Sequence, residues 1–304
     1  MNEPNWALAR KRLTLLERAR IIGVIRTFFI KRGYLEMETP HRIPANAPEP
    51  HIDPVASGSW ALHTSPELAM KRLLAAGYGQ LFQICRVWRD GEQGQYHLPE
   101  FTLLEWYQCG VDYHALMTEC MELLATLAPQ GKLSRQGRTI DLARPWPQLT
   151  VGDAFARYAS QSLDEALVGN CFEELLTTEV EPHLGKDRPL FLTEYPARLA
   201  ALARTKPGDP QLSERFELYI DGLELANAFS ELTDPHEQRS RFEADEAARR
   251  AAGKAPYPLP EKFLSELGSM PAAAGIALGL DRLIMLLTDA ARIDDVVAFT
   301  PGEL

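Results

Sequence analysis

The segment spanning residues 81–107 constrains the fold of this chain more than any other. It is mostly apolar up to Trp88, and residues 90–94 then supply the aspartate and glycines that favour a tight reversal. The pattern predicts two antiparallel strands around a polar turn. Alternation along the returning strand would place four side chains on one face of the sheet: His97, Phe101, Glu105 and Tyr107.

This set of side chains predicts a site for an anionic, ring-bearing ligand. Arg89 ends the first strand with a positive charge, and Phe101 offers a ring for stacking. ATP matches such a site. The alternative is a half-buried hairpin with polar residues on its surface, but an arginine, a histidine, an aromatic ring and a carboxylate on one face favour the ligand site.

Composition restricts the class of protein. The chain has 304 residues, 45% of them hydrophobic and 24% charged, which is typical of a globular protein with one large domain or two small ones. We expect no membrane span and no signal peptide. The net charge of −10 argues weakly against a nucleic-acid partner. The cysteines lack CxxC pairs and zinc spacing, which indicates reduced thiols and a cytoplasmic location: Cys85, Cys109, Cys120 and Cys171.

Residues 6–32 have apolar positions close to helical spacing, and Gly33 ends the predicted helix before a short strand at 34–40. The helix is strongly basic, with Glu17 as its one acidic residue within 10–32. We favour a solvated face with apolar stems packed below it. The alternative is a docking surface for an acidic partner protein.

Three further elements follow from local signals. Pro66 suits a first helical turn and Ser65 its cap, which predicts a helix over residues 68–75. Glu67 either interacts with the helix dipole or belongs to a site. Residues 112–127 predict an amphipathic helix and 190–195 a short strand, whereas 128–189 indicate mostly helices and loops.

Asp221-Gly222 between two apolar runs predicts a second hairpin. In this register Tyr219 is opposite Glu224, and Glu217 is opposite Ala226. Glu217 and Glu224 then lie diagonally on one face, where two carboxylates repel each other unless a cation lies between them. Magnesium suits such a pair. An exposed acidic hairpin remains an equal alternative.

Strict alternation would put Asn227 and Glu231 on the face opposite Glu224. If all three line one pocket, the strand must bulge after Glu224. Near the end of the chain, small residues alternate over 275–279, which lets a flat ring approach the backbone, and Arg282 follows at a strand–helix junction.

The sequence RVWRDGEQGQYHLPEFTLLEWY resembles motif 2 of the class II aminoacyl-tRNA synthetases, in their lysyl branch. Residues 18–40 are similar to motif 1, 275–287 to motif 3, and 226–232 to the lysyl family's (G/A)NGFxEL segment. Within this branch, the chain most resembles the stand-alone elongation factor P lysine ligases. The resemblance implies an α+β fold with a mainly antiparallel sheet flanked by helices. It also implies one catalytic domain over 1–304, no anticodon-binding domain, and a homodimer formed through motif 1.

The activity implied by the resemblance is ATP-dependent activation of lysine or (R)-β-lysine as an adenylate. The lysyl group is then transferred to a lysine side chain of elongation factor P. The implied cofactors are ATP and Mg²⁺, and tRNA is not an expected partner. The alternatives are a truncated lysyl-tRNA synthetase acting on tRNA and a non-catalytic regulatory paralogue.

The resemblance also assigns roles to individual residues. The catalytic pair is Arg89 and Arg282. The ATP-binding set is Arg89, Asp90, Gly91, His97, Leu98, Phe101, Glu217, Leu218, Gly279 and Arg282. The residues implied for lysine are Ser65, Glu67, Glu105, Tyr107, Glu224, Asn227, Glu231 and Ala277. The implied metal ligands are Glu217 and Glu224.

Ala228 replaces the glycine of the (G/A)NGFxEL segment, and three further positions depart from the family pattern. Ala277 replaces the middle glycine of motif 3, and we infer that its methyl group affects which lysine isomer fits. Gly91 stands at the glutamate that usually reads adenine, and Leu98 replaces an asparagine. Either Glu92 moves in to compensate, or backbone groups of Asp90 and Leu98 hold the adenine.

Overall fold

A nine-stranded mixed sheet forms the centre of this computed structural model, which describes residues 6–200 and 202–304. Most neighbouring strands are antiparallel, whereas β1–β5 and β10–β9 are parallel. The order is β1 (Leu35–Glu36), β5 (Gln80–Trp88), β6 (Glu100–Cys109), β14 (Ala273–Gly279), β13 (Leu223–Ser230), β12 (Asp209–Ile220), β10 (Leu190–Pro196) and β9 (Gln148–Thr150), and β11 (Thr205–Lys206) pairs with β12. The predicted α+β architecture with a mainly antiparallel sheet is confirmed.

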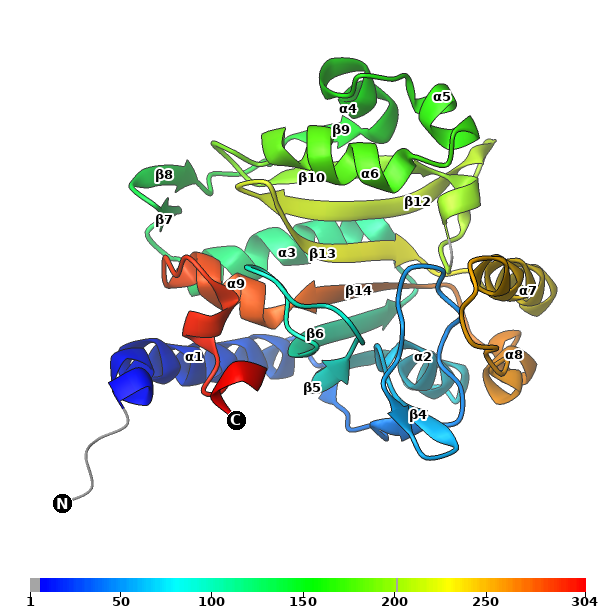
Figure 1. Ribbon diagram of the computed structural model, residues 1–304, viewed down its shortest axis with the longest axis horizontal. Coiled ribbons are helices and arrows are strands. Elements are labelled where there is room, and N and C mark those ends of the chain that lie inside the picture. The colour runs from blue at the N-terminus through cyan, green and yellow to red at the C-terminus, as the bar shows by residue number, and fades with distance from the viewer. Residues whose placement is uncertain (1–5, 201) are drawn as a thin grey trace.

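Helices cover the sheet and its two ends (Figure 1). Those of the larger core are α1 (Trp6–Lys31), α3 (Tyr113–Leu127) and α9 (Leu280–Leu287). The others are α2 (Glu67–Ala75), α4 (Val151–Tyr158), α5 (Leu163–Val168), α6 (Phe172–Leu175), α7 (Pro235–Ala251) and α8 (Glu261–Leu267). Short π or 3₁₀ turns occupy Leu176–Val180, Glu181–His183, Ala197–Leu199, Ile293–Val296 and Pro301–Glu303.

Period-two alternation separates the two faces of the sheet. Even-numbered residues of β5 and β6 point to the main core, where Phe82 stacks on Phe29 of α1 with ring centroids 5.0 Å apart, and Trp106 packs beside them. Helix α3 lies against the same side of the sheet. The odd-numbered residues of β6 therefore face the other way, toward the loops in front of the sheet.

The predicted helix boundaries agree closely with the structure. Gly33 has φ +84°, a left-handed backbone that favours glycine, directly after α1. Asp112 caps α3 because its carboxylate accepts a hydrogen bond from the His114 N–H. Ser65 Oγ accepts from the Glu67 N–H at the start of α2.

The first hairpin differs from the prediction in its connection. Residues 89–99 form an eleven-residue loop between β5 and β6, so His97 lies in this loop and not on the returning strand. Pro99 has no N–H to donate to a ladder. The Asp90 N–H donates instead to Asp53 O of another loop, 2.7 Å away. The predicted tight turn at 90–94 is therefore wrong.

The second hairpin has the predicted turn, with Asp221 at φ +57° and Gly222 at φ +74°. Tyr219 is opposite Glu224 as expected, but Glu217 is opposite Asn227 and not Ala226. The pairing shifts because Leu225 is an extra residue in β13. This is the bulge after Glu224 that a shared pocket requires, and it returns Asn227 to the face of Glu224.

Residues 128–189 hold more β-structure than expected. A separate hairpin pairs β7 (Lys132–Arg135) with β8 (Arg138–Asp141). Helices α4 to α6 pack with β9 and β10 around a small apolar cluster. The proline-rich segment before α2 contains a three-stranded sheet of β2 (Arg42–Ile43), β3 (Ala56–Ser57) and β4 (Trp60–Leu62).

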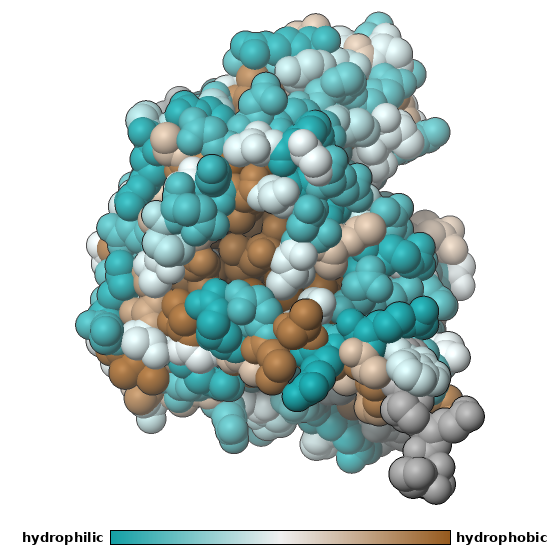
Figure 2. Space-filling view, turned by 90° about the vertical axis from the view of Figure 1, so that its left-hand side faces the viewer, coloured by the Kyte–Doolittle hydropathy of each residue, from teal (hydrophilic) through white to brown (hydrophobic). Residues whose placement is uncertain are grey.

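Figure 2 shows one face of the molecule, where a hollow with hydrophobic residues on its floor is surrounded by a mostly hydrophilic rim. Within residues 6–200 and 202–304, no helix is long and apolar enough to cross a membrane.

Candidate active site

A cavity of about 430 Å³ lies in front of β6, β14 and β13, within the range of about 300–1,000 Å³ typical of small-molecule pockets. The sheet register explains its floor. Ala277 of β14 lies between Glu105 and Asn227, and Gly275 lies between Tyr107 and Phe229. Small residues on the central strand thus leave room between larger side chains on both neighbours.

Gly275 is required by its neighbours. A Cβ atom at this position would lie 2.2 Å from Tyr107 Cε1 and 2.3 Å from Glu231 Oε1. At Gly279 the nearest atom would be Arg282 Cδ, 3.7 Å away, which is an ordinary contact. The ring that approaches the backbone at Gly275 is therefore Tyr107 of the chain itself.

Most of the residues expected from the sequence meet at this cavity. Those that line it are Ser65, Glu67, Arg89, His97, Leu98, Phe101, Tyr107, Glu217, Glu224, Asn227, Ala277, Gly279 and Arg282. Five expected residues do not line it: Asp90, Gly91, Glu105, Leu218 and Glu231. Leu218 points into the main core, while Glu105 and Glu231 are buried behind the lining side chains.

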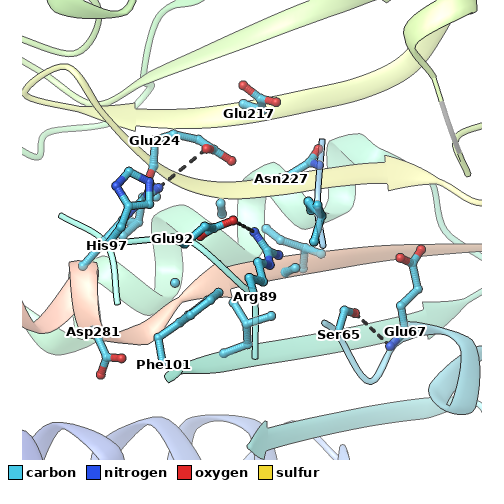
Figure 3. A pocket seen from close by; sticks show the side chains of 18 of the residues that line it. Ser65, Glu67, Arg89, Glu92, His97, Phe101, Glu217, Glu224, Asn227 and Asp281 are labelled. Atoms are coloured by element: carbon cyan, nitrogen blue, oxygen red, sulfur yellow. Dashed lines mark hydrogen bonds and ion pairs between the residues drawn. The ribbon is translucent and has the colours of Figure 1, made fainter. Parts of the chain in front are cut away.

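Figure 3 shows the arrangement of the lining residues along the cavity. His97 lies at one end, Arg89 near the middle, and Ser65 and Glu67 at the other end. Glu217, Glu224 and Asn227 lie on the opposite side of the cavity from Phe101. The cavity thus has a cationic end and middle, and a carboxylate at its far end.

Arg89 lies between an aromatic ring and a carboxylate. Its guanidinium is 5.1 Å from the Phe101 ring centroid, and its Nη1 is 3.7 Å from Glu92 Oε1. Glu92 lines the cavity, whereas Gly91 has φ +75°, a backbone that disfavours a side chain. A glutamate side chain is thus present in the cavity one position after Gly91.

Arg282 connects the cationic end to β13. Its Nη1 donates to Glu224 O at 2.8 Å and lies 3.6 Å from Glu224 Oε2, and its Nη2 is 2.5 Å from His97 Nε2. Burial and the charges of Arg282 and Arg89 lower the pKa of His97 to about 4. His97 is therefore neutral at pH 7, so it accepts the hydrogen bond from Arg282.

Glu217 and Glu224 are the two carboxylates expected to bind a metal ion. Arg215 Nη2 lies 2.5 Å from Glu217 Oε1, and the Tyr219 hydroxyl donates to Glu217 Oε2 at 2.7 Å. Burial, and then the charge of Glu217, raise the pKa of Glu224. The two carboxylates repel each other, so a cation bound between them would be favourable.

In the described part of the chain, no cluster of three or more histidine, cysteine, aspartate or glutamate side chains could hold a metal. Two carboxylates fit Mg²⁺ nonetheless, because this ion is usually bound by one or two carboxylates together with substrate phosphates and water. Glu181 lies near the pair, and burial and the charges of Glu224 and Glu217 raise its pKa to about 8.

A buried lysine that no sequence pattern indicated lies at the carboxylate end of the cavity. Lys71 Nζ lies 2.5 Å from Glu67 Oε1 and 2.5 Å from Glu231 Oε2, with no exposed side-chain surface. It also lies 4.9 Å from the Phe229 ring centroid. The charges of Glu231 and Glu67 outweigh burial and raise the pKa of Lys71, so this ammonium stays charged.

Glu105 holds two other side chains in place. The Ser65 hydroxyl donates to its Oε1 at 2.7 Å and the Tyr107 hydroxyl to its Oε2 at 2.9 Å. Burial and the charge of Glu67 raise the pKa of Glu105 to about 8, although both hydroxyls oppose this shift.

Other lining residues also received no role from the sequence, among them Glu49, Glu173 and Arg215. Arg215 Nε donates to Asn227 Oδ1 at 3.0 Å. Alternation from Glu217 would have placed Arg215 on the same face of β12. Glu49 lies in a loop without periodicity, so no local pattern could identify it.

The basic helix α1 contributes to the site from behind. Arg18 pairs with Asp281, donates to Thr102 Oγ1 at 2.9 Å, and reaches Val296 O at 3.1 Å. Other basic residues of α1 are paired within the chain, such as Lys11 with Glu303 and Arg26 with Glu36.

Comparison with known proteins agrees with this geometry. The family model of the class II tRNA synthetases (D, K and N) matches residues 7–302. The chain is similar to a protein of Erwinia tasmaniensis named elongation factor P–(R)-beta-lysine ligase, with 41% identity and 97% of each chain covered. Proteins of the same name from Edwardsiella ictaluri and Klebsiella pneumoniae subsp. pneumoniae are 41% and 42% identical, over 97% and 94% of each chain.

Proposed function

The chain belongs to the class II tRNA synthetases (D, K and N), and from that premise we propose that it ligates a lysine isomer to elongation factor P. ATP activates lysine or (R)-β-lysine as an adenylate, and the lysyl group passes to a lysine side chain of the factor. The relatives that cover 94–97% of this chain carry the name of such a ligase. They do not favour a truncated tRNA synthetase or a non-catalytic paralogue.

The observation that carries the proposal is the polarity of one continuous cavity. Arg282 and Arg89 provide cations at one end and in the middle, whereas Glu67 lies at the far end with a fixed hydroxyl, Ser65, beside it. A triphosphate and an ammonium-bearing substrate fit such a cavity in one orientation. The two reacting groups then meet at Arg89.

The first step needs positioning and charge neutralisation, not a protein nucleophile. A carboxylate oxygen of the lysine attacks the α-phosphorus, the bond to the bridging oxygen breaks, and pyrophosphate leaves. Arg89 holds the α-phosphate and the substrate carboxylate, while Arg282 and neutral His97 bind the outer phosphates. Phe101 stacks on the adenine, whose edge is read by Glu92 or by backbone groups of Asp90 and Leu98.

Glu217 and Glu224 would hold Mg²⁺, which supplies positive charge to the phosphates when it is bound. The substrate ammonium groups bind near Glu67 and Tyr107, which line the cavity, with the carboxyl groups of Glu105 and Glu231 buried behind them, and Asn227 contacts the carboxylate. Ala277 on the floor limits the space for the lysine chain and affects which isomer fits.

The site residues act within one catalytic domain, which we propose forms a homodimer through α1. This helix exposes large apolar side chains that a partner would cover: Trp6, Leu13, Leu16 and Ile30. Residues 1–5 and 201 lie outside the described structure. The cytoplasmic location remains a prediction from the cysteines.

Incubation with ATP and each lysine isomer tests the first step through isotope exchange between pyrophosphate and ATP. Full-length elongation factor P and bulk tRNA are then offered as acceptors. We expect lysine-dependent exchange and labelling of the factor. Exchange with transfer to tRNA alone would overturn the acceptor, and absence of exchange by the folded protein would overturn the reaction.

A further inference from the structure

Glu49 is a carboxylate in the cavity for which the steps above leave no role. It lies in the loop after β2, lines the cavity together with Arg89, and also borders a small recess beside Ser65 and Glu67. Its carboxylate makes no hydrogen bond or ion pair with the residues that the structure describes. An unpaired carboxylate at this place is available to a substrate.

The loop around Glu49 is held by three charged side chains, of which Arg249 is buried. Arg249 of α7, only 3% exposed, donates from Nη1 to Glu49 O at 2.7 Å and to Ile52 O at 2.8 Å. Its Nη2 pairs with Asp53 at 2.7 Å, and Lys254 Nζ donates to Pro50 O and Asp53 Oδ2, both at 2.8 Å. This loop therefore has a fixed position over the cavity.

The same loop is fastened to the residue next to Arg89. The Asp90 N–H donates to Asp53 O at 2.7 Å. The loop that carries Glu49 is thereby bonded to the backbone next to Arg89, the residue that positions the reacting carboxyl group in the proposed first step.

The surroundings of Glu49 suit a proton acceptor. The charged groups that act on it come from four elements: Arg89 of the 89–99 loop, Glu67 of α2, Arg215 of β12 and Asp245 of α7. Burial is the largest effect and, opposed by Arg89, raises the pKa of Glu49 to about 7. A base is most effective when its pKa lies near the working pH.

The transfer step needs such a base. A lysine side chain with a pKa of about 10.4 is almost entirely ammonium at neutral pH and has no lone pair for attack. Three other carboxylates of the cavity already have cationic partners: Glu67 has Lys71, Glu92 has Arg89, and Glu217 has Arg215. Glu173 also lines the cavity, but the charges that act on it are those of Arg215, Glu217 and His51 and not that of Arg89.

We propose that Glu49 is the general base of the transfer step. Its carboxylate accepts one proton from the acceptor lysine ammonium. The freed Nζ lone pair attacks the adenylate carbonyl carbon, an amide bond forms, and the carbon–oxygen bond to the phosphate breaks. AMP leaves with both bonding electrons, and the second amine proton passes to water. This inference rests on the proposed function and adds a residue to its second half.

Glu49→Gln tests the assignment, with exchange and transfer measured separately at pH 7. We expect transfer from preformed adenylate to elongation factor P to fall about 100-fold, as for loss of a general base. Lysine-dependent exchange should fall much less. Hydroxylamine, an amine already unprotonated at neutral pH, should still capture the adenylate. The matched control is Glu243→Gln, an exposed carboxylate of α7, and it should behave like the wild type.

The pH profile distinguishes a base from a merely structural residue. Wild-type transfer should level off above neutral pH, whereas transfer by Glu49→Gln should rise about tenfold per pH unit as the acceptor amine deprotonates. If Glu49→Gln unfolds, Glu49→Ala with added formate provides the second measurement, and formate should restore transfer.

Four results would overturn the assignment. The first two are an equal loss of exchange and transfer in Glu49→Gln and normal transfer by this variant. The third is a pH profile of Glu49→Gln that matches the wild type. The fourth is a loss of transfer in Glu173→Gln while Glu49→Gln keeps its activity. Absence of exchange in the wild type would instead overturn the proposed function itself, so the two failures are distinguishable.

Discussion

Lys71 Nζ lies 2.5 Å from Glu231 Oε2 in a part of the site where neither side chain has exposed surface. Both carboxylates that contact this lysine, Glu67 and Glu231, were expected to bind the amino groups of the substrate. The two carboxylates therefore share one internal ammonium, and Glu67 is the one of them that also lines the cavity.

Replacement of this internal cation should destabilise the protein strongly. Lys71→Met leaves the buried Glu231 and the half-buried Glu67 without a cationic partner, so the free energy of unfolding should fall by about 3–5 kcal/mol. Urea denaturation at pH 7 measures this loss. The double variant Lys71→Met/Glu231→Gln also removes the unpaired charge of Glu231 and should recover part of the stability. Equal stability of the wild type and the single variant would contradict the buried ion pair.

The buried carboxyl group of Glu105 should make stability depend on pH. Its folded-state pKa of about 8 lies above the ordinary value of 4.5, so the folded chain binds the proton more tightly than the unfolded chain. This contribution is fully present below pH 4.5 and is lost as the pH rises to about 8, at up to about 1.4 kcal/mol per pH unit.

The free energy of unfolding of the wild type and of Glu105→Gln, measured between pH 5 and 9, isolates this effect. The amide cannot titrate, so the difference in stability between the two proteins should change with pH in that window. Parallel profiles would show that Glu105 does not titrate there.

Gly275 provides a test of the floor of the cavity. The added methyl group of Gly275→Ala would meet the Tyr107 ring and Glu231, so we expect a loss of about 1–3 kcal/mol and weaker lysine binding in the exchange assay. Gly279→Ala on the same strand meets no atom closer than 3.7 Å and should lose less stability. Equal losses would mean that the close approach at Gly275 is not limiting.

The proposed dimer depends on the exposed apolar surface of α1. Leu13 and Leu16 are 79% and 60% exposed, so their replacement by glutamate should cost the folded monomer little and place charges in the contact. Analytical ultracentrifugation should show a dimer for the wild type and a monomer for Leu13→Glu/Leu16→Glu. An unchanged dimer would place the contact elsewhere.

The sequence predicted those parts of the site that depend on local geometry. The Asp221-Gly222 turn fixes the pairing of Tyr219 with Glu224, and alternation places Phe101 and Tyr107 on one face. The bulge at Leu225 has no local signal, so the predicted partner of Glu217 was wrong. It became predictable only when the chemistry required Asn227 to lie beside Glu224.

Other features depend on contacts between distant segments. Lys71 follows Glu67 by one helical turn, which is visible in the sequence, but the approach of Glu231 comes from another strand. His97 was placed on a strand because the pattern alone does not reveal that the loop before Pro99 pairs with residue 53. The position of Glu49 depends on how a proline-rich loop folds around Arg249, which no local sequence pattern reveals.

The contacts of Arg18 join the proposed subunit contact to the nucleotide end of the site. Helix α1 exposes Leu13 and Leu16, while Arg18 on the same helix forms an ion pair with Asp281, the residue directly before Arg282. Arg18 and Asp281 contact each other directly. The helix of the proposed subunit contact and the arginine at the phosphate end are therefore joined by one ion pair and one peptide bond.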